Sequence, residues 1–421
     1  MKTTLQILAF LLVAGAAANA QVAPAATGPG GLPISGSLQY SLRFSQTAEF
    51  GGSIGNWETS NASASAAYSN GHERFPFILT YSGGYAYTES GPSYSTGLFQ
   101  NLSLSQGFTW RKLNLTLSDD ASYRPQAPTT GFSGIAGIGD IGTGTGSGTT
   151  SSQTVLTLKA HALNNIATGQ LNYTLTSATS LDLGGSTELL RYVDGNGLDT
   201  NTRMANAGVT RRLNARNSLT AKYTFYQFSY PDYGYTITAN SGLFGFTREW
   251  NRKISTDISV GPQWTRSSGN SVTTSISSVP SSINVATNAS LSYKFRFTTA
   301  NLIYTHGTGS GGGYMFGAEE DSAGLNLSRD FTKNLTIAVD ASYRRTAGLQ
   351  NNESIDGMYS GVQATRRLGR YMSVFASYNA ENQSTSQNSS LTSSNPAILN
   401  NLLQVVSFGI GYSPRETQLR H

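Results

Sequence analysis

Alternation of apolar and polar residues, broken by short basic turns, recurs along most of this chain. In the stretch NLSRDFTKNLTIAVDASYRR, residues 326–345, Leu335, Ile337 and Val339 share one parity and Asp340 lies on the other. A period of two is typical of a strand with one apolar and one polar face. The charged residues between the two alternating runs predict a tight turn, so the stretch is a predicted β-hairpin.

The same hairpin pattern returns at 104–123, 206–228, 245–264, 291–307 and 362–380. Ascending strands are predicted to begin near Leu38, Phe75, Leu113, Leu181, Ser218, Ile254, Thr299, Leu335 and Tyr371, in most cases roughly 37 residues apart, the length of two strands, one tight turn and one longer loop. Descending strands are predicted at 59–69, 99–109, 166–176, 202–213, 236–249, 284–295, 321–331, 355–366 and 402–412. The pattern predicts about 18 strands, within a range of 16–20.

The longest interval separates the strands that begin at Leu113 and Leu181. Its segment 131–152, GFSGIAGIGDIGTGTGSGTTSS, is too rich in glycine for a paired strand in a membrane. We therefore expect a long Gly/Ser/Thr-rich loop over 125–152. Residues 154–163 are either a strand within that loop or an extension of the next wall strand.

Composition supports an all-β protein. Charged residues make up 12% of the chain, while it has 46 glycines and 22 tyrosines, which suits neither a disordered chain nor a helical one. The chain contains no cysteine, which excludes a disulfide framework and a thiolate metal site.

The first 20 residues resemble a secretory signal peptide. Lys2 precedes an apolar run, and Ala18-Asn19-Ala20 fits a cleavage site. Residues 21–35 are expected to form a flexible leader, followed by the β domain over 36–413. Beyond the signal, no apolar run is long enough for a transmembrane helix.

Three features favour a membrane barrel over a soluble sandwich. Aromatic residues recur near both ends of the strands, as with Trp110 and Tyr123, at a spacing that spans an apolar band of about 25 Å. Short turns connect the predicted strands at one end of the barrel, and long loops connect them at the other end. Basic residues gather at the turns, as at 211–216, and acidic residues in the long loops, as at 319–321.

With these features the chain resembles a bacterial outer-membrane β-barrel of the porin-like kind over residues 36–413. The final strand, LLQVVSFGIGYSP, is similar to the C-terminal strand of such proteins, although a tail at 414–421 follows it. The resemblance implies a single antiparallel up-and-down transmembrane barrel in the outer membrane of a diderm bacterium, with both termini periplasmic. It also implies contact with outer-membrane lipid and lipopolysaccharide, and it allows a homotrimer.

Sequence motifs for chemistry are weak. The G-x-S-x-G string at 51–55 and the G-x-G-x-x-G string at 137–142 lack the strand-to-helix context that their chemistry needs. The four histidines show no metal-ligand spacing. We expect no enzyme activity, catalytic residue, metal or cofactor, and no nucleic-acid binding, because no basic stripe interleaved with aromatic residues is present.

The inward parity of the strands predicts the pore lining. The candidate pore-lining residues are Asp120, Glu188, Lys222, Asp257, Lys294, Asp340 and Arg344. A barrel of about 18 strands is wide enough for an aqueous channel. The first hypothesis is passive diffusion of small hydrophilic solutes or ions, with loop 131–152 folding inward to narrow the pore and an acidic outer mouth that concentrates cations.

Two alternatives remain open from the sequence. One is a non-conducting structural barrel, or one associated with polysaccharide export, whose long loops contact surface polysaccharide. The other, ranked last, is an enzyme built into the barrel wall. A steady conductance would distinguish an open channel from a non-conducting structural barrel.

Overall fold

The computed structural model describes residues 36–51, 55–90, 96–124, 161–193, 195, 197–269, 281–350, 353–386, 402–414 and 417–419. The predicted signal peptide, the leader, loop 125–152 and most of 154–163 lie outside these residues. In the described part, no helix is long and apolar enough to cross a membrane.

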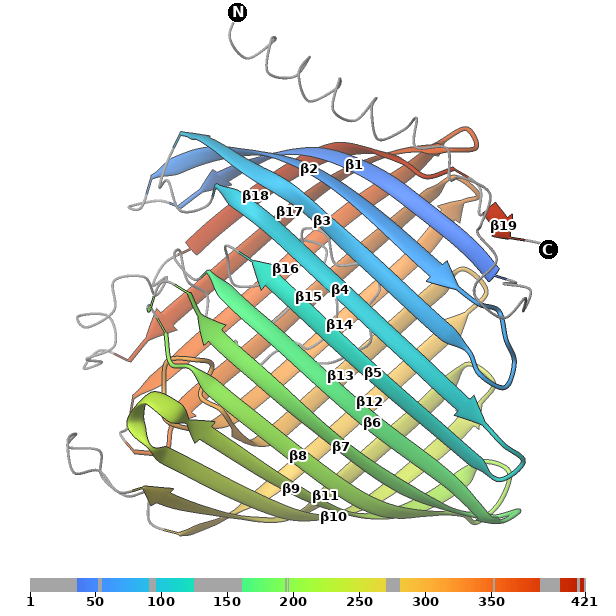
Figure 1. The fold of residues 1–421 in the computed structure, drawn as a ribbon, viewed down its shortest axis with the longest axis vertical. Coiled ribbons are helices and arrows are strands. Elements are labelled where there is room, and N and C mark those ends of the chain that lie inside the picture. The colour runs from blue at the N-terminus through green and yellow to red at the C-terminus, as the bar shows by residue number, and fades with distance from the viewer. Residues whose placement is uncertain are drawn as a thin grey trace, which may run out of the picture.

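Eighteen antiparallel strands form a closed barrel, which confirms the predicted fold class and strand number (Figure 1). The strands are β1 (Gly36–Phe50), β2 (Asn56–Ser69), β3 (Phe77–Ser90), β4 (Gly97–Thr109), β5 (Leu113–Arg124), β6 (Ala162–Thr176), β7 (Thr179–Tyr192), β8 (Thr200–Arg212), β9 (Asn217–Tyr230), β10 (Tyr235–Asn251), β11 (Ile254–Gly269), β12 (Ser282–Phe295), β13 (Thr298–Gly309), β14 (Ala318–Thr332), β15 (Leu335–Gly348), β16 (Ser354–Leu368), β17 (Met372–Thr385) and β18 (Leu402–Tyr412).

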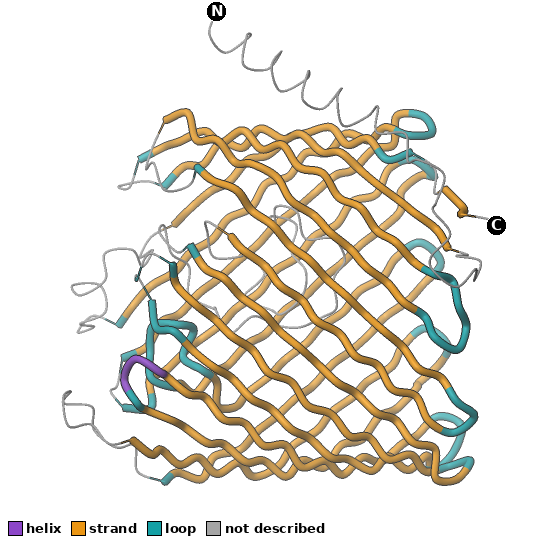
Figure 2. The backbone as a smooth tube through the Cα atoms, viewed as in Figure 1, coloured by secondary structure: helices purple, strands orange, loops and turns teal. Residues whose placement is uncertain are grey.

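Each strand pairs with its neighbours in the chain, and β1 closes the barrel against β18, with Phe44 opposite Ile410. Both the start of β1 and the end of β18 lie at the end of the barrel with the tight turns (Figure 2). Within the predicted C-terminal tail, β19 (Thr417–Leu419) pairs with Gly36–Leu38, so part of this tail extends the sheet.

Strand β15 shows why these residues form a barrel wall. Val339 and Tyr343 are exposed on the outer face, whereas Asp340 and Ser342 between them are only 7% and 8% exposed. The same alternation runs through the other strands, and large apolar side chains such as Phe408 remain exposed on the outside. An apolar outer face and a polar inner face are the arrangement expected for a barrel in lipid.

Side chains close several of the tight turns. The Asn251 side-chain oxygen accepts hydrogen bonds from the backbone N–H groups of Lys253 (2.8 Å) and Ile254 (3.0 Å). The Thr332 hydroxyl accepts bonds from Asn334 (3.2 Å) and Leu335 (3.0 Å). Asn and Thr side chains stabilise turns in this way. The charged stretch between the two alternating runs is therefore a hairpin turn, as predicted.

Candidate functional site: inner wall and inward-folded loop

The inner face of the barrel is polar. Its buried polar and charged side chains include Thr47, Glu49, Thr59, Asn61, Glu188, Thr224, Gln263, Asp340, Arg344, Asn379, Glu381 and Gln383, all at inward positions of their strands. A lumen with this lining is suited to water and polar solutes rather than to lipid.

The seven predicted pore-lining residues all lie at inward positions. Glu188 on β7 and Asp340 and Arg344 on β15 are buried, and Asp120 on β5 is half-buried. The other three, Lys222 on β9, Asp257 on β11 and Lys294 on β12, are exposed and lie closer to the tight turns. Asp340 and Arg344 lie four residues apart on β15, and the others are distributed around the wall. Their role in a pore remains a prediction.

The loop between β13 and β14, residues 310–317, folds inward. The Tyr230 hydroxyl on β9 donates a hydrogen bond to the Ser310 carbonyl oxygen (2.6 Å) and accepts one from the Gly317 N–H (2.7 Å). The Leu198 N–H donates to the Gly313 carbonyl oxygen at 2.7 Å. Tyr230 is 1% exposed. A single buried hydroxyl of β9 therefore holds both ends of this loop.

Apolar packing holds the tip of the loop. The Phe316 ring makes edge-on contacts with three tyrosines of the β9–β10 hairpin: Tyr230, Tyr233 and Tyr235, at centroid distances of 5.2, 4.8 and 5.7 Å. Tyr233 belongs to the short 3-10 helix η4 (Pro231–Tyr233). Next to Phe316, Tyr314 and Met315 are buried in a cluster that includes Leu190 and Tyr192 of β7 and Ile355 of β16. The loop thus joins three separate parts of the loop-end mouth.

Glycine is required at two positions of this loop. Gly313 and Gly317 have φ values of +84° and +71°, a region that L-residues with a Cβ adopt only at a cost. A Cβ at Gly313 would lie 2.0 Å from the Tyr192 hydroxyl, and one at Gly317 would lie 2.3 Å from Ile237 Cδ1. The glycines therefore allow close approach of the loop to the inner wall.

The inward-folded loop is not the one predicted from the sequence. Residues 131–152, predicted to fold inward, lie outside the described residues, whereas the loop 310–317 was not singled out by the sequence. The signal that identifies it is the apolar triplet Tyr314-Met315-Phe316 between glycines. Three consecutive large apolar side chains are out of place in a solvated loop, and here they are largely buried.

A polar patch lies beside this loop on the inner face of β14 to β17. We define the inner acidic patch as Glu320, Asp340, Arg344, Tyr359, Asn379 and Glu381. Arg344 forms an ion pair with Glu320, and the other oxygen of that carboxylate accepts a hydrogen bond from the Gly311 N–H at 3.3 Å. The patch and the inward loop are therefore directly connected.

Strand register explains how the rest of the patch comes together. Asp340 is opposite Gly361, which is opposite Asn379 on the next strand. The Tyr359 hydroxyl donates to the Asn379 side-chain oxygen at 3.3 Å. A Cβ at Gly361 would lie within 2.8 Å of the polar atoms of all three neighbours, so glycine leaves the space into which these side chains converge.

The patch carries a surplus of negative charge. The patch contains three carboxylates, those of Glu320, Asp340 and Glu381, and one guanidinium, that of Arg344, so its formal charge is −3 + 1 = −2. Glu49 lies in the same lateral row, two strands beyond Asn379 through Val405. Fixed negative charge in a confined aqueous space raises the local concentration of cations.

Basic side chains reach the lumen near the tight turns. Lys222 and Lys294 face inward there. Arg43 on β1 lies over the ring of Phe375, with its Cζ 3.8 Å from the ring centroid. Asp257 and Asp330 also face inward at this end, so side chains of both signs line the lumen near the tight turns.

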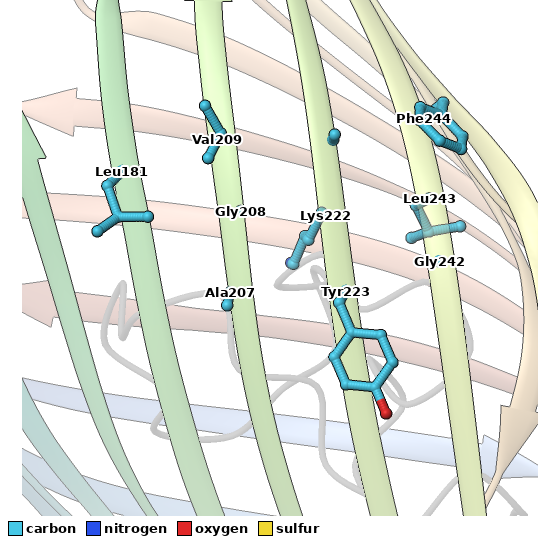
Figure 3. A pocket seen from close by; sticks show the side chains of 10 residues that line it. Leu181, Ala207, Gly208, Val209, Lys222, Tyr223, Gly242, Leu243 and Phe244 are labelled. Atoms are coloured by element: carbon cyan, nitrogen blue, oxygen red, sulfur yellow. The ribbon is translucent and has the colours of Figure 1, made fainter. Parts of the chain in front are cut away.

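A separate depression lies on the outer face over β7 to β10 (Figure 3). Its lining residues are Leu181, Ala207, Gly208, Val209, Ala221, Lys222, Tyr223, Gly242, Leu243 and Phe244. The outward side chains among these, such as Leu181 and Phe244, are apolar. This depression suits acyl chains rather than polar solutes, so the candidate site is inside the barrel.

Metal binding has no structural support among the described residues, where no group of three or more His, Asp or Glu side chains is arranged to hold an ion. His306, on the outer face, makes two contacts with carboxylates: Nδ1 with Asp321 at 2.7 Å and Nε2 with Glu319 at 3.2 Å.

No family model and no curated protein matches this chain. Among solved structures, OccK2 (OpdF) of Pseudomonas aeruginosa is similar at 12% identity over 90% of this chain and 97% of that chain, with a TM-score of 0.48. OccAB3 of Acinetobacter baumannii is similar at 9% identity over 91% and 99%, with a TM-score of 0.46. A structure of OccK2 (OpdF) in complex with glucuronate is similar at 13% identity over 92% and 99%, with a TM-score of 0.46.

Proposed function

We propose that this protein is a porin-like channel of the outer membrane through which small hydrophilic solutes and ions diffuse passively. The observation that carries the proposal is the pairing of an apolar outer wall with a polar, charged inner wall in a closed barrel of 18 strands. Barrels of 16–18 strands are wide enough for an aqueous channel. The proposed role is not enzymatic.

The tight-turn end is proposed to face the periplasm. Both described chain ends lie there, and the turns at that end are short, as is usual for bacterial outer-membrane barrels. The long loops then face outward, where they would contact lipopolysaccharide. A homotrimer belongs to this proposal as an expectation from the resemblance, and cross-linking in the native membrane would test it.

The inner acidic patch and the inward-folded loop are proposed to set selectivity. The loop narrows the loop-end mouth beside carboxylates whose net charge is negative, so the channel should favour cations. The seven inward residues predicted from the sequence, Asp120, Glu188, Lys222, Asp257, Lys294, Asp340 and Arg344, are proposed to line the path.

Single-channel recording tests this function. The mature chain, refolded and inserted into a planar bilayer, should give stable conductance steps in potassium chloride, with a cation-favouring reversal potential in a salt gradient. If heat-modifiable, β-rich protein inserts and never conducts, the channel proposal fails. In that case the non-conducting barrel associated with structure or polysaccharide export becomes the better proposal.

A further inference from the structure

A short motif recurs at the turn ends of four descending strands. It places an arginine two residues before a large apolar residue: R-R-L at 211–213, R-E-W at 248–250, R-D-F at 329–331 and R-R-L at 366–368. These segments end β8, β10, β14 and β16. We name their first residues, Arg211, Arg248, Arg329 and Arg366, the outer arginine row.

These four side chains face outward. Arg211 is opposite Leu219 on β9, and Arg329 is opposite Ile337 on β15, so each lies on the apolar outer face. Arg366 is opposite Leu335 in the same way. All four arginines are exposed. Their guanidinium groups therefore lie at the margin of the wall that faces lipid.

Aromatic rings position two of the four guanidinium groups. Arg248 Cζ lies 4.1 Å from the centroid of the Trp250 ring, and Arg329 Cζ lies 5.0 Å from that of Phe331. Aromatic residues at this level mark the membrane interface in outer-membrane barrels. Cation–π contact fixes these guanidinium groups near the interface and leaves their N–H donors available.

Among the described residues, the ion pairs involve Arg191, His306 and Arg344. No described carboxylate pairs with the outer arginine row. Within the R-D-F motif, Asp330 points to the inner face and accepts a hydrogen bond from the Thr336 hydroxyl at 2.7 Å. The acid is thus turned away from the arginine beside it. In the part of the chain that the structure describes, the outer face at the turn end therefore carries positive charge that no carboxylate pairs with.

We propose that the outer arginine row binds the headgroups of anionic glycerophospholipids in the leaflet at the tight-turn end. This inference rests on the membrane placement in the proposed function. Guanidinium groups bind phosphate oxygens through paired N–H donors, and arginine suits such sites better than lysine. Positively charged side chains are attracted to an anionic membrane surface when they lie within about one Debye length of it.

Tryptophan quenching by brominated lipid provides a local measurement. The chain has four tryptophans, of which Trp250 lies beside the arginine row and Trp264 lies on the outer face near the loop end of β11. Two reporters, each retaining one of these tryptophans with the other three changed to Phe, are placed in phosphatidylcholine vesicles. Brominated phosphatidylglycerol or brominated phosphatidylcholine is added as the quencher.

The expected result is a preference for phosphatidylglycerol at Trp250 and none at Trp264. In the Trp250 reporter, the quadruple variant R211Q/R248Q/R329Q/R366Q should reduce the preference for phosphatidylglycerol at least about fivefold at low salt. This lower bound is the factor expected from the loss of one arginine near an anionic surface. The control R212Q/R367Q/K222Q/K294Q removes the same charge from inward positions, where Arg212 and Arg367 are opposite Ser218 and Ser373, and should keep the preference.

Equal quenching by both lipids at Trp250, or an equal loss in the inward control, would overturn the proposal. Heat-modifiable mobility checks that each variant folds. If the quadruple variant fails to insert, the single variant R248Q and a potassium chloride titration of the unmodified reporter decide instead, because Arg248 lies beside Trp250 and salt should abolish the preference. Conductance of the same proteins is recorded separately, so a lipid-binding barrel that does not conduct counts against the channel alone.

Discussion

The Arg344 guanidinium on β15 forms an ion pair with the Glu320 carboxylate on β14, on the inner face of the barrel beside the inward-folded loop. The pair neutralises one of the three acids of the inner acidic patch, whose other two carboxylates belong to Asp340 and Glu381. Because the two side chains carry opposite charges, neutralising one or the other should shift ion selectivity in opposite directions.

The variants R344Q and E320Q should therefore shift the reversal potential in opposite directions. R344Q changes the patch from −2 to −3 and should increase cation preference, whereas E320Q changes it to −1 and should decrease it. The double variant R344Q/E320Q returns the formal charge to −2 and should restore a value near that of the unmodified protein. Bilayer recording in a salt gradient measures all three. A shift of the same sign in both single variants would contradict this assignment.

Removal of the Tyr230 hydroxyl should release the loop. Y230F loses the bonds to Ser310 and Gly317, each contributing about 1 kcal/mol, and leaves buried groups without a partner. The loop should become mobile, which should appear as larger or noisier conductance. The control Y223F removes an exposed hydroxyl that bonds Asn240 on the outer face, and it should leave the recordings unchanged. Unchanged recordings with Y230F would show that the loop does not narrow the path.

Alanine at Gly317 should disturb the same loop through steric overlap. The positive φ costs about 1–2 kcal/mol for any L-residue, and the new Cβ would also meet Ile237. Gly369 separates these two effects, because it has a φ of +86° and no atom within 4 Å of an added Cβ. G317A should lower the temperature of the heat-modifiable transition more than G369A does, and it alone should alter conductance.

The barrel wall was predictable because period two is a local property of each strand. The predicted starts at Leu113, Ile254 and Leu335 coincide with those of β5, β11 and β15. The start predicted near Phe75 lies two residues before that of β3. The Asn70 side chain bonds both the Phe75 carbonyl oxygen and the Phe77 N–H, so the turn extends to Pro76. The alternation of apolar and polar residues carries no sign of these side-chain bonds, so the sequence pattern could not show where the turn ends.

The site was less predictable because it depends on contacts between distant strands. Parity alone selected inward charges such as Asp340 and Arg344, but nothing local indicates that Glu320 pairs with Arg344 or that Gly361 leaves space beside Asp340. The contact of loop 310–317 with Tyr230 joins residues about 80 positions apart. Only the closed register of the sheet brings these groups together.

Neighbouring residues on β5 provide the sharpest test of the inward parity. Asp119 is exposed on the outer face, where it accepts a hydrogen bond from the Asn165 side chain at 2.9 Å, whereas Asp120 lies at an inward position. D120N removes a carboxylate from the lumen and should lower cation preference, because fewer fixed negative charges face the conducting path. D119N makes the same chemical change one residue away and should leave the reversal potential unchanged. If D119N shifted the potential as much as D120N, the assignment of faces on β5 would be wrong, and the lining predicted there would have to be moved to the odd-numbered residues.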